Sequence, residues 1–119
     1  MGGINLQPMD LSTLFTANAA APYAWSLVLA GAVVMASIVP LGAARSQADF
    51  TMADMAAPRA MFDRLPAWGR RATWAHQNSF EGFTLHAPAC LFALIAGTTA
   101  PAALLAAWLF PLLLSLIHI

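Results

Sequence analysis

The residues of this chain most able to do chemistry lie between Arg71 and Glu81, where charged and amide side chains enter an apolar segment. Arg71, Asn78 and Glu81 follow one another at intervals of seven and three residues. At about 100° per residue, these intervals place the three side chains in one stripe along a helix. An ionisable group inside a membrane costs about 2.5–3.5 kcal/mol on insertion scales, so the stripe marks a candidate functional site.

The stripe reaches from the edge of a membrane towards its middle. With a rise of 1.5 Å per residue, Glu81 lies about 15 Å along the helix axis from Arg71. A carboxylate at that depth must be protonated or paired, and we expect its partner to come from another helix or subunit. Two interpretations follow. The stripe forms a polar pocket for the head of an amphipathic ligand, or Asn78 and Glu81 hold an oligomer together.

Composition identifies a membrane protein. Of the 119 residues, 61% are hydrophobic and 8% are charged, whereas a soluble domain has about 25% charged residues. All five arginines lie between positions 45 and 71, and the chain has no lysine. This distribution does not form the basic face of a nucleic-acid-binding protein. By the positive-inside rule, it places the loop 45–71 on the cytoplasmic side.

The pattern of apolar runs predicts an all-α integral membrane helix bundle, a single domain over residues 1–119. We predict transmembrane helices over residues 22–43, 66–98 and 101–116. The first two are long enough for a bilayer of about 30 Å, whereas the third is shorter than the roughly 20 residues that a crossing needs. The segment between the first two carries alternating charges and is expected to be a solvated loop.

The last six residues, 114–119, have a second interpretation. Their sequence, LSLIHI, is also the translation of CTG TCT CTT ATA CAC ATC, an end sequence of a transposon used to prepare sequencing libraries. We therefore expect these residues not to be native and the chain to be a C-terminally truncated fragment. A native apolar tail is the alternative.

Other reactive side chains are interpreted as structural. Cys90 lies in an apolar run and packs as a small hydrophobic residue rather than acting as a nucleophile. His76 and His86 are ten residues apart and do not form the i, i+4 pair of a metal site, so no metal is predicted. We expect His76 to be a polar residue at an interface and His86 to form hydrogen bonds in the core.

The order R-x-x-x-A-H-x-N-x-x-E, formed by Arg71, Ala75, His76, Asn78 and Glu81, resembles the MAPEG family, the membrane-associated proteins of eicosanoid and glutathione metabolism. The resemblance implies a protomer of four transmembrane helices, of which three are visible here, and a homotrimer with a glutathione site between subunits on the cytoplasmic side. It also implies that Asn78 and Glu81 help to hold glutathione, with Arg71 as a further contact.

Three departures from the family pattern bear on activity. Trp74 stands where glutathione-using members commonly have an arginine, so one cationic anchor for a glutathione carboxylate is missing. Thr84 stands in place of a proline, and the chain has a proline at Pro88 instead. A fourth helix bearing the tyrosine and arginine that would bind and activate the thiol is not visible.

Three functional hypotheses follow. The first is a bacterial-type MAPEG protein of the inner membrane, acting as a glutathione- or thiol-dependent transferase or peroxidase on lipophilic small molecules. The second is a non-catalytic relative that binds membrane lipids or supports assembly. The third, a small multidrug-type transporter using Glu81, requires a carboxylate in the first transmembrane helix, and that helix has none.

Overall fold

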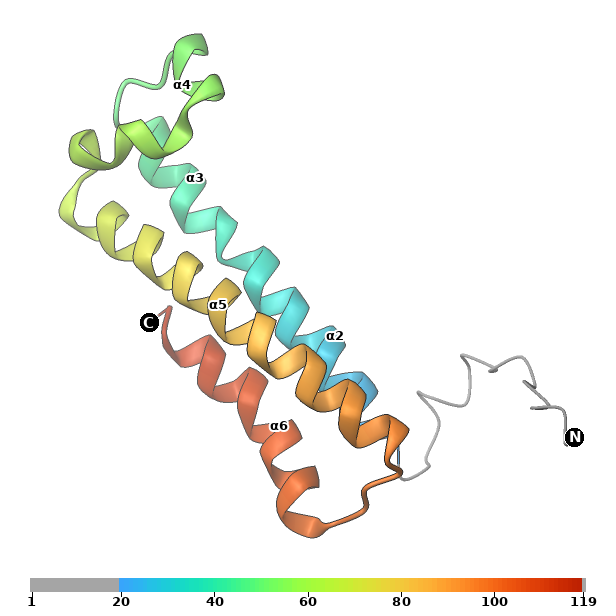
Figure 1. Cartoon of the computed structure of the whole chain (residues 1–119). Helices are drawn as coiled ribbons and strands as arrows, with labels where there is room; N and C mark the ends of the chain where they lie inside the picture. The colour runs from blue at the N-terminus through green and yellow to red at the C-terminus, as the bar shows by residue number, and fades with distance from the viewer. Residues whose placement is uncertain (1–19, 119) are drawn as a thin grey trace, which may run out of the picture.

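The computed structural model describes residues 20–118, which form helices and connecting turns with no strand. The prediction of an all-α fold is confirmed for this part of the chain. Two long antiparallel rods lie side by side, a shorter helix packs along one half of them, and small helices close the other end (Figure 1). In chain order the helices are α2 (Ala21–Ala36), α3 (Ile38–Ser46), α4 (Met52–Ala56), η1 (Pro58–Arg64), α5 (Ala67–Ile95) and α6 (Pro101–Leu116).

The first rod consists of α2 and α3, separated only at Ser37. Pro40 has no N–H, and its ring crowds the preceding turn, which explains a break three residues upstream. The backbone at Ser37 stays in the right-handed helical region, so the two helices form one continuous rod. The rod extends three residues beyond the predicted end at 43, because neither Pro40 nor Gly42 terminates it.

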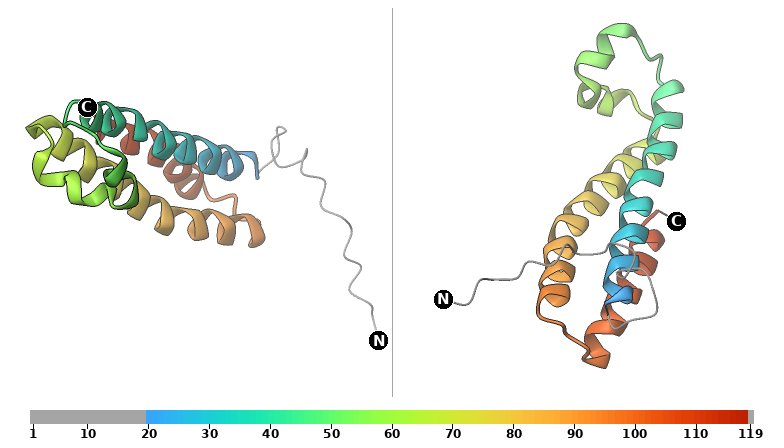
Figure 2. Two further views of the ribbon diagram at one scale, coloured as in Figure 1. Left: turned by 90° about the horizontal axis from the view of Figure 1, so that it is seen from above. Right: turned by 90° about the vertical axis from the view of Figure 1, so that its right-hand side faces the viewer.

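The second rod, α5, runs antiparallel to the first, and α6 turns back beside α2 (Figures 1 and 2). Both helices begin next to a proline: Pro66 caps α5 and Pro101 is the first residue of α6. Proline suits these positions because the first helical N–H groups have no partner within the helix. Since α6 packs mainly on α2, the half of the bundle near α3 has only two rods.

The turn between α5 and α6 is fixed at both ends. Gly97 has φ of +61°, and hydrogen bonds from Gly97 N to Leu94 O (3.2 Å) and from Thr98 N to Ala93 O (3.0 Å) form a Schellman motif. The hydroxyl of the buried Tyr23 donates to Thr98 O at 2.9 Å. The start of α2 therefore holds the α5–α6 turn in place.

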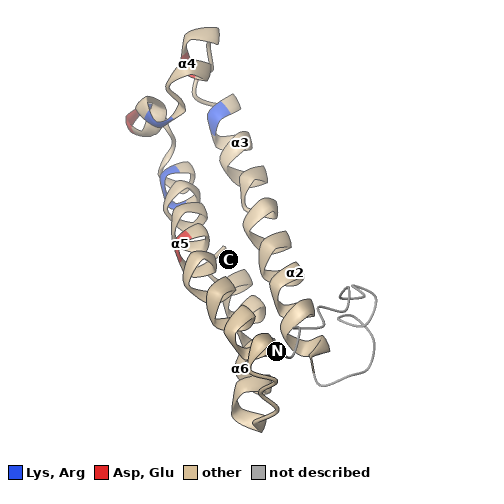
Figure 3. Ribbon diagram, turned by 45° about the vertical axis from the view of Figure 1, so that its right-hand side comes forward, with Lys and Arg blue, Asp and Glu red and all other residues tan. Residues whose placement is uncertain are grey.

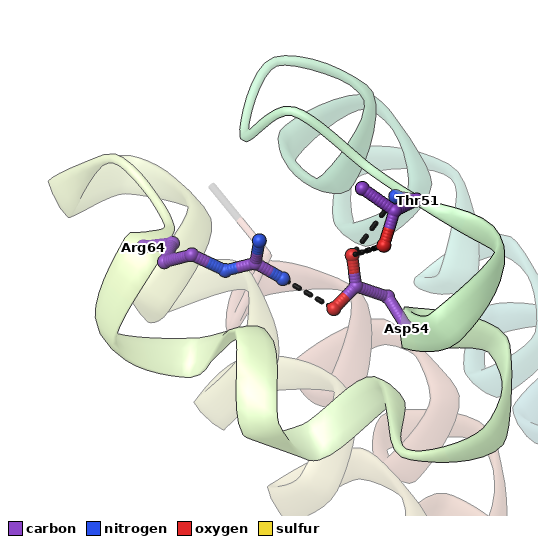
Figure 4. A network of polar contacts seen from close by, with 3 residues as sticks. All are labelled: Thr51, Asp54 and Arg64. Carbon is purple, nitrogen blue, oxygen red and sulfur yellow. Dashed lines mark hydrogen bonds and ion pairs between the residues drawn. The ribbon is translucent and has the colours of Figure 1, made fainter.

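The segment expected to be a solvated loop is folded into a small cap. Asp54 accepts hydrogen bonds from Thr51 N and Thr51 Oγ1, both at 2.9 Å, and pairs with Arg64 (Figure 4). Met61 is fully buried and packs in a cluster with residues of α3 and the cap. Most residues of this segment are exposed, as a solvated segment should be. The expectation of a loop was wrong, because an apolar contact between segments distant in sequence holds the helices α4 and η1 in place. The other members of the cluster are Leu41, Ala44, Ala48 and Leu65.

Within residues 20–118, one rod, Ala21–Ser46, has the length and sustained hydropathy needed to cross a membrane. The helix Pro101–Leu116 is apolar but has 16 residues. The 29 residues of α5 are long enough, but the polar stripe lowers their hydropathy. The predicted crossings by α5 and α6 therefore remain predictions, although helices occupy both positions.

Candidate functional site

The helix α5 has an inner and an outer face. Its inner face packs on the first rod and α6 through residues such as the buried Gly69, Ser79 and Cys90. Arg71, Asn78, Glu81 and the intervening Gln77 are all exposed. The stripe predicted from sequence therefore lies outside the packed core of the chain.

Charges gather at one end of the molecule. The arginines and aspartates of the described part lie at the end of α3, in the cap and at the start of α5, and Glu81 lies farther along α5 (Figure 3). The opposite end of the bundle has no charged residue among those described. This one-sided distribution is that expected of a protein with one end at a membrane surface.

Within the stripe, the structure shows one direct contact. Gln77 Nε2 donates a hydrogen bond to Glu81 Oε1 at 3.0 Å, across one helical turn. The neighbouring Arg70 points elsewhere: its Nη1 donates to Leu65 O at 2.9 Å and ties α5 to the cap. Arg71, the first residue of the stripe, is exposed and is the cation available at its N-terminal end.

A wide groove of about 1140 Å³ opens between α3, the cap and α5. Gln77 and Glu81 line it, whereas Arg71 and Asn78 do not. The structure thus brings part of the predicted site into a concavity and leaves the rest on the outer surface. Sequence reasoning missed Arg45 and Arg59, which line the same groove. Their only signal in the sequence was membership of the arginine-rich segment.

Trp74, which replaces the arginine common in the family pattern, also lines the groove. Its ring tilts against Phe62 of the cap, with centroids 5.6 Å apart and an interplanar angle of 44°. At this position the chain therefore has an aromatic contact that supports the cap. Any cationic contact for a ligand in the groove must come from other residues.

Both histidines of α5 bond to serines of the first rod. His76 Nδ1 lies 2.6 Å from Ser37 Oγ, and His86 Nε2 lies 2.7 Å from Ser26 Oγ. Each serine donates its single proton to a backbone carbonyl, Val34 O and Ala107 O respectively. Each hydroxyl must therefore accept a hydrogen bond from the histidine, which places a proton on His76 Nδ1 and on His86 Nε2.

The prediction that His86 forms hydrogen bonds in the core is confirmed. Its ring also stacks on Phe110, with centroids 3.7 Å apart, and its Nε2 lies 3.3 Å from Sγ of the buried Cys90. His76 faces the first rod within the same chain. Among residues 20–118, no three His, Cys, Asp or Glu side chains come together as a metal site would require.

Comparison with known proteins places this sequence in a family. The model of the MAPEG family matches residues 22–116, which include both rods, the cap, α6 and the whole polar stripe. No curated protein and no solved structure matches the chain. Because the family model covers most of the sequence, the resemblance seen in the stripe is confirmed. The chain belongs to the MAPEG family of membrane-associated proteins.

Proposed function

We propose that this chain is an integral membrane protein whose polar stripe binds glutathione, or a related thiol, for transfer to lipophilic substrates or for reduction of lipophilic peroxides. The observation that carries the proposal is the exposure of Arg71, Asn78 and Glu81 on the long helix α5 of a MAPEG protein. Polar groups at such a position are costly unless a partner satisfies them.

The spacing of the stripe fits the size and charges of glutathione. By helical rise, Arg71 and Asn78 lie about 10 Å apart along the axis, and Asn78 and Glu81 about 5 Å apart. An extended tripeptide spans about 10 Å. Arg71 suits a carboxylate, Asn78 a peptide group and Glu81 an ammonium group, which together match the groups that glutathione carries.

The bound thiol would supply a nucleophilic sulfur, which must be a thiolate to react well. A nearby positive charge lowers the pKa of a thiol. Arg70 and Arg71 are the cations near the stripe. Arg70 directs its Nη1 to the carbonyl of Leu65, whereas Arg71 is exposed at the stripe and is the better placed of the two to provide this charge. Because the stripe faces outward, a lipophilic substrate can approach it from the membrane.

A second copy of the chain would cover the stripe. The outer face of α5 combines the polar stripe with large exposed apolar residues, including Leu85, Phe92 and Ile95. Contact with another subunit would remove both from lipid, which supports a homo-oligomer with ligand sites between subunits; the number of three subunits comes from the family resemblance. In this arrangement α2–α3, α5 and α6 cross a bacterial inner membrane, with the loop 45–71 in the cytoplasm.

A non-catalytic protein of the same fold, binding membrane lipids or supporting assembly, is the second candidate. Trp74 favours it, because this residue packs on Phe62 where a cationic ligand contact would be expected. The two candidates differ in whether thiol-dependent turnover occurs.

Activity of the full chain in detergent tests the proposal. We expect conjugation of glutathione to a lipophilic aryl halide, or glutathione-dependent reduction of a lipid hydroperoxide. Glu81→Gln should lower kcat/KM at least about tenfold, since a hydrogen bond to a charged group contributes about 1.5–3 kcal/mol. Asn78→Ala should lower it about 2- to 10-fold, since a neutral hydrogen bond contributes about 0.5–1.5 kcal/mol. Thr84→Ala is the control, because its exposed hydroxyl bonds only the carbonyl of Glu81 in its own helix. A folded oligomer without either activity would favour the non-catalytic candidate.

A further inference from the structure

The groove between α3, η1 and α5 has a cationic end and an apolar wall. Arg45 and Arg59 provide its positive charges. The wall includes aliphatic and aromatic side chains from all three helices, among them Leu41, Phe62 and Phe80. A ligand that fills this groove must therefore combine an anionic head with an extended apolar part.

The two arginines are free to bind an anion. The side-chain Nε of Arg45 is buried and has no hydrogen-bond partner among the described residues. The only ion pair found within residues 20–118 joins Arg64 to Asp54, so Arg59 also has no acidic partner there. Because Arg45 and Arg59 both line the groove, an anion bound there could form charge-assisted hydrogen bonds with their guanidinium groups.

The acidic residue of the groove lies well away from its cationic end. A Cβ built on Gly69 would lie 2.5 Å from Ala44 Cβ, so Arg45 is at the level of Gly69 along α5. Glu81 follows twelve residues later, about 18 Å farther along the helix axis. An anion at Arg45 would therefore not meet the carboxylate. Between these two levels, α5 lines the groove with the aromatic Trp74 and Phe80 and with the polar Thr73, His76 and Gln77.

The cationic end also lies where a membrane surface is expected. Arg45 is the penultimate residue of the apolar rod Ala21–Ser46. At 1.5 Å per residue, these 26 residues span about 39 Å, more than the roughly 30 Å of a hydrocarbon core. The rod therefore brings Arg45 to the depth of lipid headgroups, with the groove descending along α3 and α5 towards the acyl chains.

We propose that this groove binds an anionic phospholipid, with its phosphate at Arg45 and Arg59 and an acyl chain along Leu41, Phe62 and Phe80. Of the stripe residues, Arg71 and Asn78 lie outside this groove, and Glu81 lines it about 18 Å along α5 from the proposed phosphate position. It requires that the first rod crosses the membrane, but it does not require thiol chemistry at the stripe.

Native mass spectrometry of the full chain, exchanged from detergent into mixtures of phosphatidylglycerol and phosphatidylcholine, tests this site. We expect the protein to retain phosphatidylglycerol at least about fivefold better than phosphatidylcholine. Arg59→Gln should abolish most of this preference and leave the fold intact, because Arg59 is exposed. Arg45→Gln should have the larger effect, and Arg45→Lys should restore part of the binding. Circular dichroism checks that each variant is folded.

Arg71→Gln is the matched control, since it removes an arginine near the same membrane surface but outside the groove. It should retain the preference for phosphatidylglycerol even where it impairs glutathione binding, so the two proposals fail separately. Equal retention of both lipids, or an equal effect of Arg59→Gln and Arg71→Gln, would overturn the site. Displacement of phosphatidylglycerol by millimolar inorganic phosphate would also contradict it, because the acyl wall would then contribute nothing.

Discussion

Gln77 and Glu81 are joined by a hydrogen bond of 3.0 Å on α5, where both side chains are exposed and line the groove between α3, the cap and α5. The bond satisfies one oxygen of the carboxylate within its own helix. It leaves the rest of the carboxylate, together with Asn78, directed away from the packed core. The stripe is therefore accessible to a ligand or to a second subunit. The ligand-binding interpretation and the oligomer interpretation concern the same exposed surface.

Removal of the Glu81 side chain should weaken the oligomer. We expect Glu81→Ala to lower subunit association about 3- to 30-fold, since polar contacts between membrane helices contribute about 0.6–2 kcal/mol. His76→Ala should change association much less, because His76 faces Ser37 within its own chain. Cross-linking yield at several protein concentrations measures the effect. Equal losses in the two variants would contradict the assignment of faces on α5.

The contact between Gly69 and Ala44 should tolerate no side chain. A Cβ on Gly69 would lie 2.5 Å from Ala44 Cβ, and both backbones are fixed within helices. Gly69→Ala should therefore destabilise the protein by about 1–3 kcal/mol through overpacking. Gly42→Ala is the matched control, since nothing lies within 4 Å of a Cβ there. Denaturant unfolding in detergent compares the two, and equal stabilities would refute the close approach of α3 and α5.

The Ser26–His86 hydrogen bond should stabilise the bundle core. Ser26→Ala leaves the Nε2–H of His86 without this acceptor, which we expect to cost about 1–3 kcal/mol. Ser46→Ala is the control, because the exposed Ser46 hydroxyl bonds only Ala43 O of its own helix. Thermal unfolding followed by circular dichroism measures both. A Ser26→Ala variant as stable as Ser46→Ala would show that the pair contributes nothing.

The cap should weaken in acid. Hydrogen bonds from the backbone and then the side chain of Thr51, followed by the charge of Arg64, lower the pKa of Asp54 from its ordinary value of 3.8. Because the folded-state pKa is the lower one, the stabilisation is complete above 3.8 and is lost as the pH falls through the folded-state value.

Hydrogen exchange of cap amides between pH 7 and pH 3, corrected for intrinsic rates, detects this loss. Asp54→Asn should remove the acid-dependent component, whereas Asp63→Asn, elsewhere in the cap, should retain it. An unchanged pH profile in Asp54→Asn would contradict the role of this carboxylate.

Local signals in the sequence predicted the helices well. Pro66 and Pro101 mark the starts of α5 and α6 because proline suits a helix start. The all-helical class and the MAPEG resemblance, both confirmed, could be predicted because they depend on periodicity and spacing within single segments. The break at Ser37 was not predicted, although Pro40 was the signal for it.

Contacts between distant segments could not be predicted in this way. The cap depends on the burial of Met61 against Leu41 and Ala44 of α3, which no local pattern reveals. The capping box of Thr51 and Asp54 was the available signal for α4, in an otherwise charged segment. The pairing of Ser37 with His76 and the convergence of Arg45 and Arg59 on one groove likewise depend on how the two rods align.

Equilibrium binding of glutathione to the full chain in nanodiscs is the most direct test of the central claim, that the α5 stripe is a ligand site. We predict saturable binding that Glu81→Gln weakens at least about tenfold and that Thr84→Ala leaves unchanged. Absence of saturable binding to the folded oligomer, or equal affinities of wild type and Glu81→Gln, would contradict the claim.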